Sequence, residues 1–180
     1  MREYKKYSEI VLSELLADYR ENFSGKVAVV QTNYKKLSEF KVMFNDDNFP
    51  HLLGLHYVTK VKYGSGIIKA IDNERITAKS IQKHHEFNAR DIRKRITSYP
   101  YLYEVFYDKQ IKVIVPTDNL KPNPMKLECV FSKGNENGEF VLGLRRDHVD
   151  GIFKPTTLHF SKKKKYSLLR QSKVIDIIWT

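Results

Sequence analysis

The chain has one cysteine, Cys129, and no apolar run long enough to cross a bilayer. A single cysteine excludes a disulfide within the chain and a site of several thiolate ligands, which fits a reducing, cytoplasmic location. Cys129 lies in a stretch that is typical of a strand, so a buried, inert thiol is expected. Polar residues follow Met1. We therefore expect neither a signal peptide nor a membrane anchor.

Motifs for metal ions and nucleotide phosphates are also missing. No His-x-x-x-His pair and no carboxylate cluster has the spacing of a metal site, so we predict no metal and no cofactor. The adjacent His84 and His85 would diverge on a helix. The Gly64-Ser65-Gly66 string lacks a third glycine and a following Lys-Ser/Thr pair. It is therefore interpreted as a flexible break and not as a phosphate loop.

Positive charge is in excess. There are 32 Lys and Arg against 21 Asp and Glu, which gives a net charge of +11. Such an excess favours a polyanionic partner, with nucleic acid first and an anionic membrane surface second, although it could serve solubility alone. The 11 Tyr and 10 Phe suit single-stranded RNA or DNA, while most of these rings are expected in the core. The composition therefore favours a nucleic acid, RNA or DNA, as the partner, and no membrane is expected.

Helical patterns dominate the first half of the chain. Residues 3–22 predict an amphipathic helix, with Tyr7, Val11, Leu15 and Tyr19 on one stripe. The Ser24-Gly25 pair should end it. A short strand or apolar connector is expected at 26–31, followed by a helix at 34–45. Short helices are expected at 67–71 and 77–85, and Thr77 should cap the second of these. A further helix is expected from Asn88 to Tyr99.

From about residue 101 short segments rich in β-branched and aromatic residues alternate with turns. Strands are expected at 101–107, 110–115, 126–131, 139–146, 152–160 and 173–179. The length suits a single domain over 1–180, in which a helix at 1–25 precedes a body at 35–180. The expected fold is therefore α+β, a helical N-terminal half followed by an antiparallel β meander.

The stretch from Asn48 to His56 carries a histidine on each side of an apolar turn. Pro50 fixes φ, and Gly54 permits a backbone angle that other residues resist. This stretch should therefore hold His51 and His56 in a fixed place. A histidine among leucines is more often a packing residue than a catalyst, and from the residues alone both interpretations stay open.

The fourth and fifth expected strands carry further polar candidates. Alternation places a hydroxyl and an imidazole on one face of the fifth, from Thr157 and His159. One of the paired Arg145 and Arg146 should project from the same face, and the sequence does not tell which. Gly143 in mid-strand indicates a bulge or a close approach of other groups.

Two clusters of cations are candidates for contacts with nucleic-acid phosphates. The first lies on the helix expected from Asn88 and consists of Arg90, Arg93, Lys94 and Arg95. The second is the turn that contains Lys162, Lys163, Lys164 and Lys165. Either cluster could instead be an ordinary solvated surface.

Three motifs resemble a known family. They are Phe49-Pro50-His51-Leu52-Leu53-Gly54-Leu55, Phe140-Val141-Leu142-Gly143-Leu144-Arg145-Arg146-Asp147, and Pro155-Thr156-Thr157-Leu158. They are similar to motifs of the phage-associated nuclease-like domains of the barnase–EndoU–colicin–RelE (BECR) superfamily. The resemblance covers roughly residues 35–180 and leaves out the first helix. It implies a metal-independent ribonuclease fold, often carried by phages and mobile elements of bacteria.

In the chemistry that this resemblance implies, the ribose 2′-hydroxyl attacks the adjacent phosphorus. A base removes its proton, an acid protonates the leaving 5′-oxygen, and cations or hydroxyls stabilise the phosphorane. The resemblance implies that His51 transfers the proton and that Arg145 or Arg146 clamps the phosphate. It also implies that the Thr157 hydroxyl donates a hydrogen bond to the phosphate. His56 and His159 are our additions, from proximity in sequence and from the shared strand face.

Two classes of function follow from these observations. The first is an endoribonuclease, as a toxin or phage-related effector that could have an inhibitor or antitoxin protein. The alternative is a non-catalytic nucleic-acid-binding or interaction module of a phage or mobile element. The enzyme predicts RNA cleavage that depends on His51, and the binding module predicts salt-sensitive binding without a product.

Overall fold

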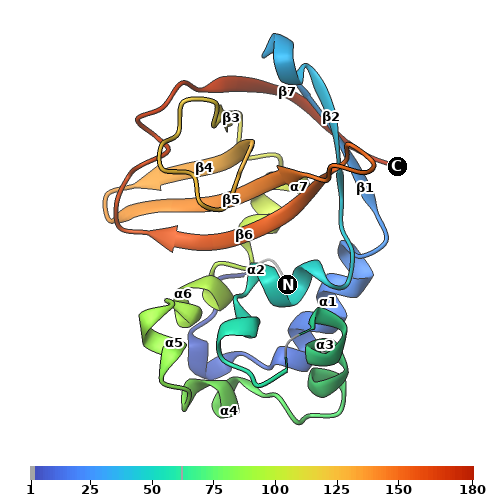
Figure 1. Cartoon of the computed structure of the whole chain (residues 1–180), viewed down its shortest axis with the longest axis vertical. Coiled ribbons are helices and arrows are strands. Elements are labelled where there is room, and N and C mark those ends of the chain that lie inside the picture. Colours follow the sequence, from blue (N-terminus) through green and yellow to red (C-terminus); the bar gives the residue numbers. More distant parts are fainter. Residues whose placement is uncertain (1–2, 62) are drawn as a thin grey trace.

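The computed structural model describes residues 3–61 and 63–180, in which a closed seven-stranded barrel lies beside a layer of short helices (Figure 1). The order around the barrel is β1-β2-β6-β5-β4-β3-β7, and β7 pairs with β1 to close it. Neighbours are antiparallel except β2 and β6, which meet in parallel at Val42 and Phe153. The strands are β1 (Val27–Thr32), β2 (Glu39–Met43), β3 (Val113–Pro116), β4 (Cys129–Asn135), β5 (Gly138–Arg146), β6 (Phe153–Ser161) and β7 (Ser172–Trp179).

The closed barrel corrects the expected order of a helical half followed by a meander. The run β3-β4-β5-β6 is antiparallel as expected, but β1 and β2 come from the N-terminal half and complete the barrel. Residues 34–45, expected as a helix, contain the 3₁₀ turn η2 (Lys35–Leu37) and strand β2. In β2 the buried Phe40 and Val42 alternate with exposed Glu39 and Lys41, a period of two that belongs to a strand.

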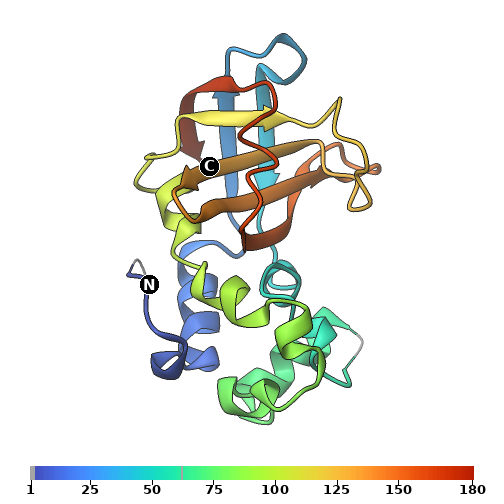
Figure 2. The ribbon, with the colours of Figure 1, turned by 90° about the vertical axis from the view of Figure 1, so that its left-hand side faces the viewer.

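Short helices gather at one end of the barrel, as Figures 1 and 2 both show. They are η1 (Tyr7–Glu9), α1 (Leu12–Asn22), α2 (Asn48–Leu52), η3 (Leu55–Tyr57), α3 (Gly64–Asp72), α4 (Ala78–Gln82), α5 (Glu86–Ala89) and α6 (Ile92–Thr97). Helix α7 (Tyr101–Phe106) lies apart from this layer, at the barrel (Figure 1). Across the described residues, no helix combines the length and the apolar character needed to span a bilayer.

Segment 101–107, expected as a strand, is instead helix α7, which packs against the barrel. All its residues but Glu104 are buried. The strand prediction failed for two reasons. A helix that is buried on nearly every side has no amphipathic sequence pattern, and the aromatic and β-branched residues of this segment favour a strand. The ring of Phe106 lies 5.0 Å from Phe44, 5.6 Å from Phe131 and 5.8 Å from Trp179, measured between ring centroids. The helix therefore fills space that the strands enclose.

The other helix boundaries differ in detail from the expected ones. The helix expected over 3–22 divides into η1 and α1, and Val11 is exposed at the junction. The one expected to begin at Asn88 divides into α5 and α6 around Asp91, whose φ is +52°. The predicted cap at Thr77 is confirmed, since its Oγ1 accepts a hydrogen bond from the Ser80 amide at 3.1 Å.

Residues Tyr63–Gly66, interpreted as a flexible break, instead begin α3. The glycines serve close packing here. A Cβ on Gly64 would lie 3.1 Å from Asp47 Oδ1, and one on Gly66 would lie 2.7 Å from Val61 Cγ1. Small residues at these positions let the first turn of α3 approach the preceding segments.

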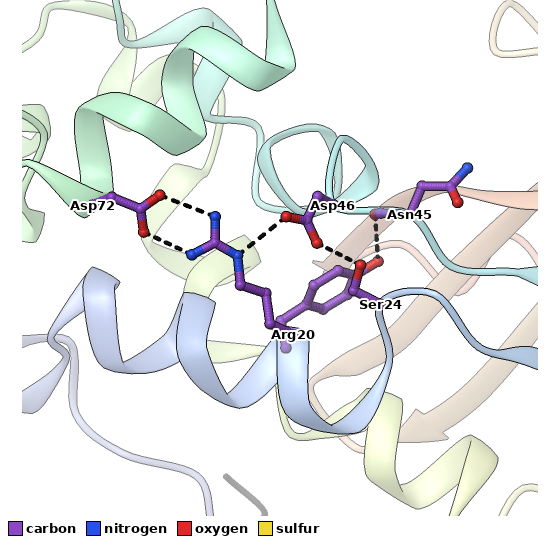
Figure 3. Close-up of polar contacts among 6 residues, drawn as sticks. Arg20, Ser24, Asn45, Asp46 and Asp72 are labelled. Atoms are coloured by element: carbon purple, nitrogen blue, oxygen red, sulfur yellow. Dashed lines mark hydrogen bonds and ion pairs between the residues drawn. The ribbon is translucent and has the colours of Figure 1, made fainter.

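Arg20 on α1 connects two other parts of the helical layer (Figure 3). Its Nη1 and Nη2 donate to the carboxylate of Asp72 at 2.7 and 3.0 Å, and its Nε donates to Asp46 Oδ2 at 3.1 Å. The hydroxyl of Ser24 also donates to Asp46. These bonds fix the residues just before α2, and so they fix the start of the segment that carries His51.

Candidate functional site

A cavity of about 390 Å³ lies between the α2–η3 segment, α6 and the ends of β5 and β6, and we call it the β6 pocket. Helices α2 and α6 lie next to β6, as Figure 1 shows. The lining includes these residues proposed from sequence: His51, His56, Arg95, Arg145, Arg146 and Thr157. Side chains that are far apart along the chain thus meet at one place.

Gly54 explains how α6 comes close enough to contribute to the pocket. Its φ is +69°, in the left-handed region that favours glycine. A Cβ there would lie 2.8 Å from Arg95 Cδ and 3.0 Å from Ile92 Cδ1. The glycine therefore gives the turn its shape and leaves room for α6, which places the Arg95 side chain against the pocket.

The two histidines of the α2–η3 segment lie side by side. The ring centroids of His51 and His56 are 4.9 Å apart, and His51 is exposed. Burial lowers the pKa of His56 to about 4, and the nearby His51 and Arg95 act in the same direction. His56 is therefore neutral at pH 7. Its Nδ1 is buried and has no hydrogen-bond partner within residues 3–61 and 63–180.

Arg95, Thr157 and His159 form a chain of polar contacts at the pocket wall. Arg95 Nη1 donates to Thr157 Oγ1 at 3.1 Å, and this oxygen lies 3.2 Å from His159 Nδ1. Burial, and then the charge of Arg95, lowers the pKa of His159 to about 4. The neutral imidazole can accept the Thr157 hydroxyl proton, which leaves the oxygen free to accept from Arg95. His159 lies behind Thr157 and does not line the pocket.

The two arginines at the end of β5 both line the pocket but differ in their partners. Arg146 lies over the Phe153 ring at 4.9 Å, and its Nε is 3.3 Å from Glu128 Oε2. Arg145 is exposed and makes no ion pair with any residue that the structure describes. It is therefore the arginine whose charge is available to a ligand.

Gly143 lies where a bulge and a close approach coincide, as the sequence indicated. The pairing of β5 with β6 shifts between Gly143 and Leu144. A Cβ on Gly143 would lie 2.6 Å from Leu127 Cδ1 and 2.9 Å from Thr157 Cγ2. The bulge separates the regular part of β5 from the arginines at its end.

The proposed phosphate-contacting clusters spread over several surfaces. From the helical cluster, Arg95 lines the pocket and Arg90 lies over the ring of Tyr57, a lining residue, at 4.8 Å. The other two point elsewhere, since Lys94 pairs with Asp91 and Arg93 lies over Tyr7. Lys162 to Lys165 are exposed and follow the far end of β6.

Seven lining residues were not among the candidates proposed from sequence, namely Asn48, Tyr57, Met125, Asp147, Lys154, Pro155 and Thr156. Asn48 and Tyr57 flank the two histidines in the chain, so their position was a usable signal. Lys154 and Thr156 lie on a strand whose alternation is interrupted near the bulge. Lys154 Nζ is 2.5 Å from Asp147 Oδ2, so its charge is balanced within the pocket.

Two expectations about thiols and metals concern other parts of the barrel. Cys129 is fully buried on β4, and burial raises the pKa of its thiol, so the expected inert thiol is confirmed. Among the residues with described positions, no three His, Cys, Asp or Glu side chains gather as metal ligands would.

Guanidinium, imidazole and hydroxyl groups that converge on one pocket define a site suited to a phosphodiester. The sequence model of the family described as phage-Barnase-EndoU-ColicinE5/D-RelE like nuclease4 (PBECR4) matches residues 11–180. The chain therefore belongs to this family of phage-associated nuclease-like proteins. The match includes α1 and β1, which the motif resemblance left out. Neither curated proteins nor solved structures gave a match.

Proposed function

We propose that the protein is an endoribonuclease that cleaves RNA by attack of the ribose 2′-hydroxyl on the adjacent phosphorus, without a metal ion. The observation that supports this proposal is the position of Arg145, which has no ion-pair partner among the described residues, in the same pocket as the adjacent rings of His51 and His56. An arginine fork can hold two phosphate oxygens, while an imidazole can move a proton near neutral pH. Membership of a nuclease family supports the same chemistry.

Each side chain has a role in this proposal. His51 is exposed in the pocket and transfers the proton. His56, neutral at pH 7, packs against His51 with ring centroids 4.9 Å apart and helps to orient it. Arg145 clamps the phosphate. Arg95, held by Thr157, adds a second positive charge to stabilise the phosphorane.

Three further residues support this machinery. Thr157 is the proposed hydroxyl donor to the phosphate, for which its proton turns from His159 Nδ1 toward the pocket while its oxygen still accepts from Arg95. His159 acts as a positioning residue through Thr157. Arg146, paired with Glu128, contributes charge at the pocket rim.

The proposed setting is the cytoplasm of a bacterium, with RNA as partner and a role as a toxin or phage-related effector. The net charge of +11 and the single buried cysteine support this setting. An inhibitor or antitoxin protein would be expected to cover the β6 pocket with acidic side chains.

The deciding experiment incubates the purified protein with bacterial RNA in EDTA. We expect fragments with 2′,3′-cyclic phosphate ends, and a loss of at least about 100-fold in rate for His51→Ala. The matched control is His85→Ala, an exposed histidine outside the pocket, which should cleave normally. RNA that stays intact but shifts on a gel would instead establish the non-catalytic binding module.

The arginines give a second test of the site. Arg145→Ala should lose cleavage without losing stability, because this side chain has no ion-pair partner among the described residues. Arg146→Ala should also destabilise the fold by about 1 kcal/mol, since it removes the ion pair with Glu128 and the contact with Phe153. Cleavage rates and urea unfolding measure both effects. Full activity of Arg145→Ala would contradict the assigned clamp.

A further inference from the structure

A second cavity, of about 490 Å³, lies in the helical layer between residues 58–61, α3 and α4, and we call it the α3 groove. Three of its lining residues are cations, Lys60, Lys69 and Arg75, and all three are exposed. None of the three forms an ion pair with another described residue. Among its described lining residues there is no carboxylate. The groove therefore concentrates uncompensated positive charge.

The linings of the groove and of the β6 pocket are adjacent along the chain. Tyr57 lines the pocket, and the next residue, Val58, lines the groove. The chain therefore passes directly from the wall of the pocket to the wall of the groove. A further cavity shares Arg145 with the pocket, and there Arg145 and Lys126 are offset by the carboxylates of Asp118 and Glu128. Charge therefore favours the α3 side as the path for a polyanion.

An exposed aromatic side chain precedes α3, the helix that forms one wall of the groove. Gly66, Lys69 and Asn73 recur at helical spacing along α3 and line the groove. Tyr63 is the N-cap of this helix, three residues before Gly66, and its side chain is 77% exposed. Cations beside an exposed ring suit a single strand, because phosphates pair with the cations and a base stacks on the ring.

We propose that the α3 groove binds the phosphates of single-stranded RNA that flank the scissile bond, and that Tyr63 stacks on one of its bases. This inference rests on the function proposed above. It extends the site from one phosphodiester to several nucleotides and gives the helical layer a role in substrate binding. The groove binds RNA mainly through its backbone, so it confers a preference for unpaired strands without fixing their sequence.

The test measures binding of an unstructured RNA of about 12 nucleotides that carries 2′-O-methyl groups, so that no 2′-hydroxyl is available for cleavage. The groove variant combines Lys60→Ser, Lys69→Ser and Arg75→Ser. Its control combines Lys112→Ser, Lys121→Ser and Lys173→Ser, exposed lysines on other surfaces. Both variants lose three positive charges. The changed side chains are exposed, so both should fold, which thermal unfolding verifies.

We expect the groove variant to bind at least about tenfold more weakly than the control at physiological salt. Its slope of log affinity against log salt should be smaller by about 2, because three contacts to a single strand contribute about 0.7 each. Equal affinity of the two triple variants for the RNA would contradict the proposal that the α3 groove binds RNA. A loss of binding to phosphatidylserine vesicles with unchanged RNA binding would also overturn it, in favour of a membrane surface.

Tyr63 gives an independent check. Tyr63→Ala should weaken binding about fivefold or more with an unchanged salt slope, since stacking releases no counterions, and Tyr63→Phe should restore it. Wild-type affinity for Tyr63→Ala would overturn the stacking part of the proposal.

A dinucleotide substrate separates failure of the groove from failure of the proposed function. It is too short to reach from the β6 pocket along the groove, so the wild type and the groove variant should cleave it equally. If no RNA is cleaved but the groove variant alone loses oligonucleotide binding, the result supports RNA binding by the groove and contradicts the proposed ribonuclease activity. If cleavage occurs and both triple variants bind alike, the groove alone fails.

Discussion

At the scale of single residues, Arg95 stands out among the four cations of its sequence cluster. It lines the β6 pocket, donates to Thr157, and lies close enough to His56 and His159 to lower the pKa of both. From the sequence the four cations were equivalent, because helical spacing does not tell which side chain meets a strand far along the chain. The structure distinguishes them by their contacts.

Burial of His159 makes stability depend on pH. Its pKa is about 4 in the folded protein against 6.5 for the free side chain, so below pH 6.5 the unfolded chain binds a proton that the folded protein does not. Stability from this group is complete above pH 6.5 and falls as the pH drops toward 4. Between pH 7 and pH 5 the loss is at most about 2 kcal/mol.

Chemical unfolding of the wild type and of His159→Gln at pH 7 and pH 5 measures this contribution. The variant should lose less stability between the two pH values, because glutamine does not titrate. His85→Gln, at an exposed position, provides the control and should follow the wild type. Identical pH dependence in the wild type and His159→Gln would show that His159 is not held neutral by burial.

At the scale of elements, the site depends on how closely α6 approaches the turn that follows α2. Gly54 permits this approach, since any Cβ would meet Arg95 and Ile92. The sequence indicated that Gly54 shapes the backbone, and at Gly143 it indicated a bulge or a close approach of other groups. It did not reveal which helix packs against Gly54, because α6 is separated from it along the chain by α3, α4 and α5.

Gly54→Ala tests this packing, with Gly25→Ala as a matched control. Both glycines have positive φ, +69° and +75°, but a Cβ on Gly25 would have nothing within 4 Å. Gly25→Ala should therefore show the backbone cost alone, about 1 kcal/mol. Gly54→Ala should cost about 1–2 kcal/mol more and reduce RNA cleavage, because Arg95 must move. Equal stability losses would mean that α6 is not packed against this turn.

At the scale of the whole molecule, β1 and α1 are integral to the fold. Strand β1 pairs with both β2 and β7, so it closes the barrel. Phe23, at the end of α1, is fully buried among aromatic rings of the helices and the barrel, including those of Tyr103 and Trp179. The family match from residue 11 includes both elements. A body beginning at residue 35 would lack them.

A truncated chain of residues 35–180 should therefore fail to fold, because it leaves edges on β2 and β7 and exposes the apolar surface around Phe23. A chain of residues 10–180 keeps α1 and β1 and should remain folded. Circular dichroism and amide exchange of the two chains make the comparison. Cooperative unfolding of the shorter chain would show that the barrel does not need β1.

The sequence by itself determined the basic charge, the later strands, the buried thiol and the segments that carry the candidate residues. Each of these follows from composition or from local periodicity, which neighbouring residues suffice to set. Tertiary structure decided the closure of the barrel, the helical state of residues 101–106 and the meeting of His51, Arg95 and Arg145 in one pocket. Strand pairing and helix packing join distant parts of the chain, so a local sequence pattern does not reveal them. A helix that is buried on nearly all sides, such as α7, also lacks the periodic pattern that would predict a helix.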